Sequence, residues 1–385
     1  MTVPVNRPFE PDTALDPGLL RVAFLNWRDT TNPEGGGSEM YVETIAEGLA
    51  ARGHQVTLVC AKHGDSPPVE IRNGIRIVRK GGKLDVYPKA AWAVRAGRIG
   101  PLDVVVDVQN GLPFCSSVAT RVPTVVLVHH VHREQWPVVY GQVRAHIGWW
   151  LESKFAPYIY RRSSYVAVSS RTREELIDLG VAAERISVVH NGTQPPPMSE
   201  HVPSPNPHIL VLGRLVPHKR VEHVLESARE LREKYPHLQV SIVGEGWWRP
   251  QLEDAAHAQG VADITTFFGH VDESTKDRLL REAWVLALPS LKEGWGLVIM
   301  EAAARGVPAV AYADAGGVVE SIADGSTGVL ARNHDDFTAA LDRLLRDGDL
   351  RHSLGSAAAL RSAEFTWESA IKDFEQILLD AVKRN

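Results

Sequence analysis

Cysteine, long apolar runs and excess positive charge are all scarce in this 385-residue chain. The two cysteines, Cys60 and Cys115, are too few for the disulfide framework of a secreted protein, and they favour a reducing, cytoplasmic setting. No apolar run approaches the ~18 residues of a membrane-spanning helix. The formal net charge of −5 argues against general nucleic-acid binding, which usually needs a basic domain.

The first eighteen residues, MTVPVNRPFEPDTALDPG, lack the apolar core of a secretory signal peptide. They are polar and rich in proline, so residues 1–18 are expected to form a flexible tail. The whole composition, with 44% hydrophobic and 23% charged residues, is close to the globular average. A chain of this length is expected to form two domains.

Short β-branched runs alternate with helical stretches, a pattern that is typical of parallel sheets covered by helices on both faces. Such runs predict strands at residues 21–27, 55–60, 75–80, 103–108, 124–130, 165–170 and 186–192, then at 208–214, 239–246, 264–271, 284–290 and 307–313. Between the first two strands, Ser38 is expected to cap a helix that Gly53 ends.

Six prolines between Pro195 and Pro207 predict a stiff linker over residues 193–207. Residues 19–192 and 208–365 are then expected to form two doubly wound, Rossmann-like α/β domains that face a cleft. Because ligands of such sheets bind beyond the carboxyl ends of the strands, the functional residues should follow strands.

The loop after the first strand carries Gly35, Gly36 and Gly37 directly before a helix. Glycines allow close approach of a ligand, and a helix N-terminus favours an anion, so a phosphate or carboxylate is expected near Gly36 and Gly37. A merely tight turn is the alternative. The dinucleotide fingerprint G-x-G-x-x-G is absent, and Cys60-Ala61 stands where a dinucleotide-binding fold needs an acid, which disfavours a dehydrogenase.

Three histidines, His129, His130 and His132, lie at the end of another predicted strand. Since side chains alternate along a strand, His130 and His132 should share a face that His129 does not, and no Cys or Asp nearby completes a metal site. One histidine that points into the cleft as a polar catalytic group is the preferred interpretation. After a later strand, Arg214 and Lys219 form a candidate diphosphate clamp, with solvated surface charges as the alternative.

The stretch LKEGWGLVIMEAAARGVPAV places Glu293 and Glu301 eight positions apart. On one continuous helix they would lie ~12 Å apart along the axis, at ~1.5 Å per residue. Glycosidase carboxylates must lie within ~5–9.5 Å across one bond, so a hydrolytic pair is disfavoured. The helix is expected to begin near Gly296, after a loop. Two acids that flank a helix N-terminus suit the two hydroxyl-bearing ends of a sugar nucleotide.

With the stretches GGGSE, LVHH, GRLVPHK, GEG, PSLKEGWGLVIMEAAARGVPAVA and GGVVESIADGSTGVL, the chain resembles the large family of retaining glycosyltransferases with two Rossmann-like domains (the GT-B fold). That family includes bacterial mannosyl- and glucosyltransferases and sucrose synthases. The resemblance extends from about Arg21 to the C-terminus and rests most on the Glu-x(7)-Glu element. It implies that the last helix, residues 366–385, crosses back to pack on the first domain.

The resemblance also implies roles for individual residues. Arg214 and Lys219 would hold the donor diphosphate, Glu301 the ribose hydroxyls, Glu293 the transferred sugar, and His129 would lie near the anomeric carbon, with His130 as the fallback. Further donor contacts are expected at Gly36, Gly37, Gly244, Gly246, His270, Val271, Gly294, Trp295, Gly296 and Leu297. Asn110, which also follows a strand, and His130 are candidates on the acceptor side.

The implied reaction moves a hexosyl unit from a UDP-, GDP- or ADP-sugar to a hydroxyl of a lipid-linked, glycan or small-molecule acceptor. Family members retain the anomeric configuration and need no bound metal or other cofactor. The leaving phosphate is expected to deprotonate the acceptor on the same face. A nucleotide-sugar epimerase and an inactive sugar-nucleotide-binding module are the alternatives, whereas a phosphorylase would need a cofactor site that the sequence does not show.

Residues 133–162 mix tryptophan, tyrosine and arginine. Interleaved aromatic and cationic side chains suit a membrane surface, which predicts a cytoplasmic protein that can associate peripherally with the inner face of a membrane. The alternative for this segment is an ordinary core helix.

Overall fold

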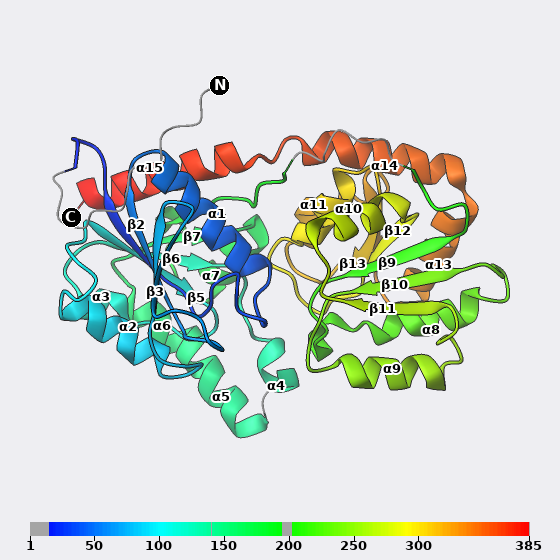
Figure 1. Cartoon of the computed structure of the whole chain (residues 1–385), viewed down its shortest axis with the longest axis horizontal. Helices are drawn as coiled ribbons and strands as arrows, with labels where there is room; N and C mark the ends of the chain where they lie inside the picture. The colour runs from blue at the N-terminus through cyan, green and yellow to red at the C-terminus, as the bar shows by residue number, and fades with distance from the viewer. Residues whose placement is uncertain (1–14, 140, 195–201, 385) are drawn as a thin grey trace. The chain divides into compact units, whose positions relative to one another are not determined.

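The computed structural model describes residues 15–139, 141–194 and 202–384 (Figure 1). The chain divides into two compact units. The first unit comprises Met1–Trp136, Tyr140–Gly192 and Trp367–Asn385, and the second comprises Pro137–Val139 and Thr193–Thr366. Most of the predicted tail and the centre of the predicted linker, residues 195–201, lie outside the described residues.

The first unit is built on an eight-stranded sheet in the order β3-β4-β2-β1-β5-β6-β7-β8. Every neighbouring pair is parallel except β3 and β4. The strands are β1 Arg21–Leu25, β2 Gln55–Cys60, β3 Val69–Arg72, β4 Ile75–Arg79, β5 Val104–Gln109, β6 Thr124–Val128, β7 Ser164–Ala167 and β8 Ile186–Val188. The helices of this unit are α1 Gly37–Ala51, α2 Val86–Arg95, α3 Ser116–Ala119, α5 Gln142–Trp150, η1 Leu151–Phe155, α6 Ala156–Ile159, α7 Ser170–Asp178, η2 Ala183–Arg185 and α15 Trp367–Lys383.

The second unit is built on a six-stranded sheet, β11-β10-β9-β12-β13-β14, in which all neighbours are parallel. The strands are β9 His208–Leu212, β10 Gln239–Val243, β11 Thr265–Gly269, β12 Val285–Leu288, β13 Ala309–Tyr312 and β14 Gly328–Ala331. Its helices are η3 Pro217–Lys219, α8 Glu222–Leu231, α9 Arg249–Ala258, α10 Glu273–Glu282, α11 Leu297–Ala303, α12 Val318–Ser321, α13 His334–Arg346 and α14 Gly348–Ser362. Helix α4, Gln135–Val139, includes residues assigned to both units.

The continuous apolar runs form the centres of both sheets, as predicted. Every residue of β5, β6 and β9 is buried, because helices cover both faces of these strands. The predicted fold class of two doubly wound, Rossmann-like sheets is therefore confirmed. Most of the strands end one to three residues before their predicted ends. The last residues of these predicted runs lie in the loops at the edge of the sheet.

The start of α1 corrects one local prediction. Gly36, and not Ser38, is the N-cap residue, and the Gly36 N–H donates to Oε2 of Glu39 at 2.8 Å. The Ser38 hydroxyl also donates to the same oxygen, at 3.0 Å. Because a glutamate at the third helical position reaches back to the helix start, Ser38 is not needed as a cap.

Helix α15 packs against α1 of the first unit. A Cβ placed on Gly48 of α1 would lie 2.2 Å from Cδ1 of Ile371, so the absence of a side chain lets the two helices approach closely. The Phe24 and Phe374 rings stack at 6.0 Å, and Glu375 accepts from Arg52 at 2.9 Å. The last helix thus completes the core of the first unit, although it follows the second unit in sequence.

Candidate active site

The two acids of the Glu-x(7)-Glu element lie on different kinds of structure. Glu293 belongs to the loop between β12 and α11, whereas Glu301 lies within α11. The helix begins at Leu297, and its N-cap Gly296 has a left-handed φ of 83°. The predicted helix start near Gly296 is confirmed, and the two acids do not share one continuous helix.

The Glu293 carboxylate is held by two donors from the same unit. Its Oε1 accepts from Nζ of Lys219 at 2.5 Å and from the Ser290 hydroxyl at 2.6 Å. The Leu291 N–H donates to the His218 carbonyl at 2.8 Å, so the loops after β9 and β12 are tied together. One cation and one anion therefore meet at the carboxyl ends of these two neighbouring strands, where ligands of doubly wound sheets bind.

The sequence pattern favours a helix start at Lys219, but the structure does not place one there. It ends the 3₁₀ turn η3, and α8 begins three residues later at Glu222. Arg220 has a left-handed φ of 49°, which interrupts the helical path between them. Arg214 lies two residues after the end of β9 and is half-buried.

Gly316 fixes the backbone at Glu293, and sequence reasoning did not assign it this role. The Glu293 N–H donates to the Ala315 carbonyl at 2.8 Å, and the Gly317 N–H donates to the Glu293 carbonyl at 3.0 Å. Gly316 has a φ of 78°, and a Cβ there would lie 2.5 Å from the Glu293 carbonyl oxygen. Only glycine fits without moving the catalytic candidate.

The Glu301 carboxylate faces a lysine of the preceding helix. Lys276 Nζ of α10 donates to Glu301 Oε1 at 3.1 Å and lies 2.8 Å from Glu273 Oε2. Burial lowers the pKa of Lys276, but the nearby carboxylates of Glu301 and Glu273 outweigh it and the net shift is upward. Lys276 therefore stays charged and orients Glu301.

Gly244 and Gly246 act as close-packing positions in the second unit. A Cβ at Gly244 would lie 2.0 Å from the Gly213 carbonyl oxygen, and one at Gly246 would lie 2.0 Å from that of Leu215. The loops after β9 and β10 therefore touch through their backbones. His270 is exposed beyond β11, while Val271 packs against the hydrophobic core.

Trp295 is buried rather than open to a ligand. Its ring meets Phe365 edge to face at 4.9 Å, which anchors the loop that contains Gly294 and Gly296. The structure therefore gives the Trp295 side chain a packing role.

In the first unit, His129 follows β6 and is buried against Tyr41, with ring centroids 5.3 Å apart. The Thr172 hydroxyl donates to the His129 carbonyl at 3.1 Å and fixes its backbone. Within the described ranges no group is hydrogen-bonded to Nε2 of His129. Burial lowers the pKa of His129 from 6.5 to about 4, so its imidazole is neutral at physiological pH.

The rings of His130 and His132 lie together, with centroids 4.2 Å apart. His130 Nε2 contacts Gln135 Oε1 at 3.1 Å, and His132 Nδ1 contacts the buried Glu152 carboxylate at 2.8 Å. The prediction from strand alternation does not apply to these histidines, because β6 ends at Val128 and all three lie in the loop beyond it. Asn110 lies after β5, and its amide donates to Asn26 Oδ1 at 3.2 Å.

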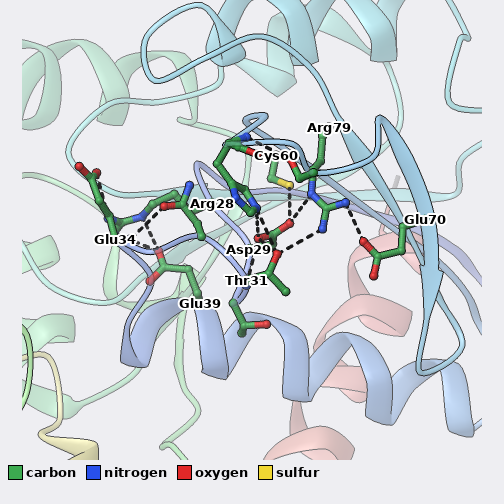
Figure 2. Close-up of polar contacts among 12 residues, drawn as sticks. Arg28, Asp29, Thr31, Glu34, Glu39, Cys60, Glu70 and Arg79 are labelled. Atoms are coloured by element: carbon green, nitrogen blue, oxygen red, sulfur yellow. Dashed lines mark hydrogen bonds and ion pairs between the residues drawn. The ribbon is translucent and has the colours of Figure 1, made fainter. Parts of the chain in front are cut away.

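Figure 2 shows two charged groups that hold the glycine loop after β1. Buried Asp29 accepts from Arg79 Nε at 2.6 Å and from the Thr31 hydroxyl at 2.8 Å. Burial raises the pKa of Asp29, but the hydrogen bonds from Thr31 and Arg79 outweigh it and lower the pKa overall. Burial, together with the Asp29 charge, raises the pKa of the neighbouring Cys60 thiol, which therefore stays protonated.

The second group centres on Glu39, whose Oε1 accepts from Arg28 Nη2 at 3.2 Å (Figure 2). Since Oε2 of the same carboxylate accepts from the Gly36 N–H, this amide is already used within the loop. Gly37 is the first residue of α1. The glycine loop is thus held in one conformation by buried ion pairs that the glycine pattern alone did not reveal.

Two family profiles match consecutive parts of the chain. Residues 35–196 match Glycosyltransferase Family 4, and residues 198–361 match Glycosyl transferases group 1. The glycogen synthase of Mycobacterium tuberculosis is 27% identical, and the match covers 94% of this chain and 95% of the relative.

Solved structures share the fold. Sucrose-phosphate synthase from Thermosynechococcus elongatus has a TM-score of 0.79 at 21% identity, over 92% of this chain and 97% of that one. Anabaena HepE, solved in complex with UDP-glucose, has a TM-score of 0.73 at 17% identity, over 93% and 98% of the two chains. The two profiles, which together span residues 35–361, the full-length relative and the shared fold agree: the chain is a glycosyltransferase of the GT-B fold.

Proposed function

We propose that this glycosyltransferase moves a hexosyl unit from a nucleoside-diphosphate sugar to an acceptor hydroxyl with retention of configuration. The observation that carries the proposal is the contact of Lys219 and Ser290 with Glu293 at the carboxyl ends of β9 and β12. A cation and a carboxylate held together there can receive a diphosphate and a sugar hydroxyl from the same ligand. The M. tuberculosis glycogen synthase and the HepE complex with UDP-glucose support a sugar-nucleotide donor.

Each candidate site residue then has a separate role in donor binding or in transfer. Lys219 and Arg214 stabilise the charge of the leaving diphosphate, which is the electrostatic share of catalysis. Glu293 and the amides from Gly294 to Leu297 bind the transferred sugar, and Glu301, oriented by Lys276, binds the ribose hydroxyls. In the first unit, the neutral His129 offers a hydrogen-bonding ring to the reacting sugar. The leaving phosphate removes the acceptor proton, so no protein base and no metal ion take part.

Thermal-shift screening of the purified chain tests the donor assignment. The screen uses UDP, GDP and ADP, and then their glucose, galactose, mannose and N-acetylglucosamine conjugates. Because a ligand at ~100 times its Kd adds about 2.7 kcal/mol of stability, selective binding gives a visible shift in melting temperature. UDP-glucose is the first candidate. A chain that no sugar nucleotide stabilises would contradict the proposal.

Transfer itself is followed by NMR of the sugar product. With the selected donor and a panel of lipid-linked, glycan and small-molecule acceptors, the product should keep the α configuration of the donor, and EDTA should leave the rate unchanged. An inverted product, or loss of activity in EDTA that a divalent cation restores, would overturn the mechanism. Conversion of the donor to its epimer without acceptor would indicate an epimerase instead.

A further inference from the structure

The helical segment formed by α5, η1 and α6 turns large apolar side chains toward solvent. Val143, Ile147 and Trp150 of α5 are 75%, 56% and 55% exposed, and Tyr158 of α6 is 66% exposed. Spacings of four and three residues place Val143, Ile147 and Trp150 on one helical face. This exposure disfavours the alternative of an ordinary core helix, because Val143, Ile147 and Trp150 face solvent and only Trp149 among the large apolar side chains of α5 is half-buried.

The opposite, buried face of α5 carries small residues, because the Trp136 ring packs against it and leaves no room for larger side chains. Ala145 and Gly148 are buried, and a Cβ on Gly148 would lie 2.5 Å from the Trp136 ring. The Trp136 indole donates to the buried Glu152 carboxylate at 2.8 Å, which fixes the ring. Since this side has no room for larger side chains, α5 cannot rotate to bury its apolar stripe.

Exposed cations lie along the same helical segment and just after it. Arg144, Lys154, Arg161 and Arg162 are all exposed. The only carboxylate between residues 141 and 162 is that of Glu152, which is buried and receives hydrogen bonds from Trp136 and from the His132 N–H. Along this segment, apolar groups and cations therefore face outward without a competing exposed acid.

We propose that this outward face, defined by Val143, Ile147, Trp150 and Tyr158 with the four exposed cations and called the α5 face, binds peripherally to an anionic phospholipid bilayer. A helix that lies in the membrane interface buries its apolar stripe among headgroups and acyl chains, while adjacent cations contact lipid phosphates. A second copy of the chain is disfavoured as the occupant, because two identical faces would bring like charges together. Binding to the bilayer needs neither donor nor acceptor, so it is independent of the proposed reaction.

Vesicle sedimentation of the full chain tests this proposal. Vesicles of phosphatidylcholine alone are compared with vesicles that contain about one-third phosphatidylglycerol. The chain should sediment with the anionic vesicles, and added salt should release it because screening weakens its contacts with lipid phosphates. The double variant Val143→Glu, Ile147→Glu should lower the partition coefficient about tenfold or more, and Arg144→Glu with Lys154→Glu should act in the same direction.

The matched control is Leu360→Glu, since Leu360 is a leucine of α14 that is 75% exposed, like Val143. This variant should bind vesicles like the wild type, and melting temperatures should show that all variants are folded. Failure of the wild type to bind anionic vesicles, or equal binding of the double variant, would overturn the proposal. A dimer in sedimentation equilibrium that the double variant dissolves would assign the face to a second copy instead.

Discussion

The buried, neutral imidazole of His129 makes the free energy of unfolding depend on pH. The unfolded chain binds a proton at this ring below pH 6.5, whereas the folded chain does so only below about 4. In that window the unfolded state binds more protons, so acidification favours unfolding. Between about pH 7 and about pH 5, His129 should cost the folded chain about 2 kcal/mol.

His129→Asn isolates this contribution, because the variant lacks the titrating group while His208 and His223, whose pKa values burial also lowers, remain in both proteins. Urea unfolding at a series of pH values gives the free energy of unfolding of each. The wild type should lose stability relative to His129→Asn as the pH falls. A difference between the two proteins that does not change with pH would show that His129 titrates normally in the folded chain.

Lys219 is the cation on which the proposed chemistry depends most. Lys219→Ala removes the charge that stabilises the leaving diphosphate, so kcat should fall about a hundredfold or more. The control is Lys234→Ala, which breaks a partly exposed pair with Asp342 and should leave kcat unchanged. Steady-state turnover of the preferred donor measures both variants, and equal rates for them would remove Lys219 from the mechanism.

At the scale of elements, the strand pattern predicted the fold because each buried strand is a continuous apolar run. Two strands were missed for physical reasons. Strand β3 is an edge strand whose Val69 and Ile71 are 51% and 60% exposed, so its sequence has no buried run. Strand β14 is four residues long and begins at Gly328, which weakens its β-strand signal.

The site residues could be predicted only in part. Glu293, Glu301, Lys219 and His129 follow strands or lie in a motif, which is why sequence pattern finds them. The partners that hold them come from distant positions: Gly316 lies on the loop after β13, and Lys276 on α10. The contacts of Gly316 and Lys276 with the two glutamates depend on the order of the strands in the sheet. The sequence pattern alone does not specify that order.

The loop that contains Gly316 contacts the loop that contains Glu293, so a side chain at Gly316 should affect turnover. Gly316→Ala places a Cβ against the Glu293 carbonyl, so the loop must move and donor turnover should fall about tenfold or more. Gly325→Ala is the control, because Gly325 also has a positive φ, 69°, but has open space where the Cβ would lie. Both variants should lose about 1 kcal/mol of stability from backbone strain.

Turnover assays and urea unfolding of the two glycine variants separate these effects. Loss of activity in Gly316→Ala alone supports the positioning role of Gly316. If Gly325→Ala loses as much activity as Gly316→Ala, backbone strain and not displacement of Glu293 is responsible.

At the scale of the whole molecule, two compact units with separate sheets should unfold as separable transitions. Phe374 of α15 is fully buried in the first unit, so Phe374→Ala should cost that unit about 4 kcal/mol. Leu360→Ala on α14 is the exposed control. In scanning calorimetry, Phe374→Ala should lower one transition, and the preferred sugar nucleotide should raise the other. A Phe374→Ala shift confined to the ligand-responsive transition would contradict this division.

The most direct test of the central claim is calorimetric titration of the preferred sugar nucleotide into wild type, Glu301→Ala and Glu273→Ala. Both glutamates contact Lys276, but only Glu301 lies on α11 beside the proposed donor site. Glu301→Ala should weaken binding at least about tenfold, the equivalent of about 1.4 kcal/mol, while Glu273→Ala should bind like the wild type. Equal affinity in all three proteins would place the donor away from Glu301 and contradict the proposed donor site.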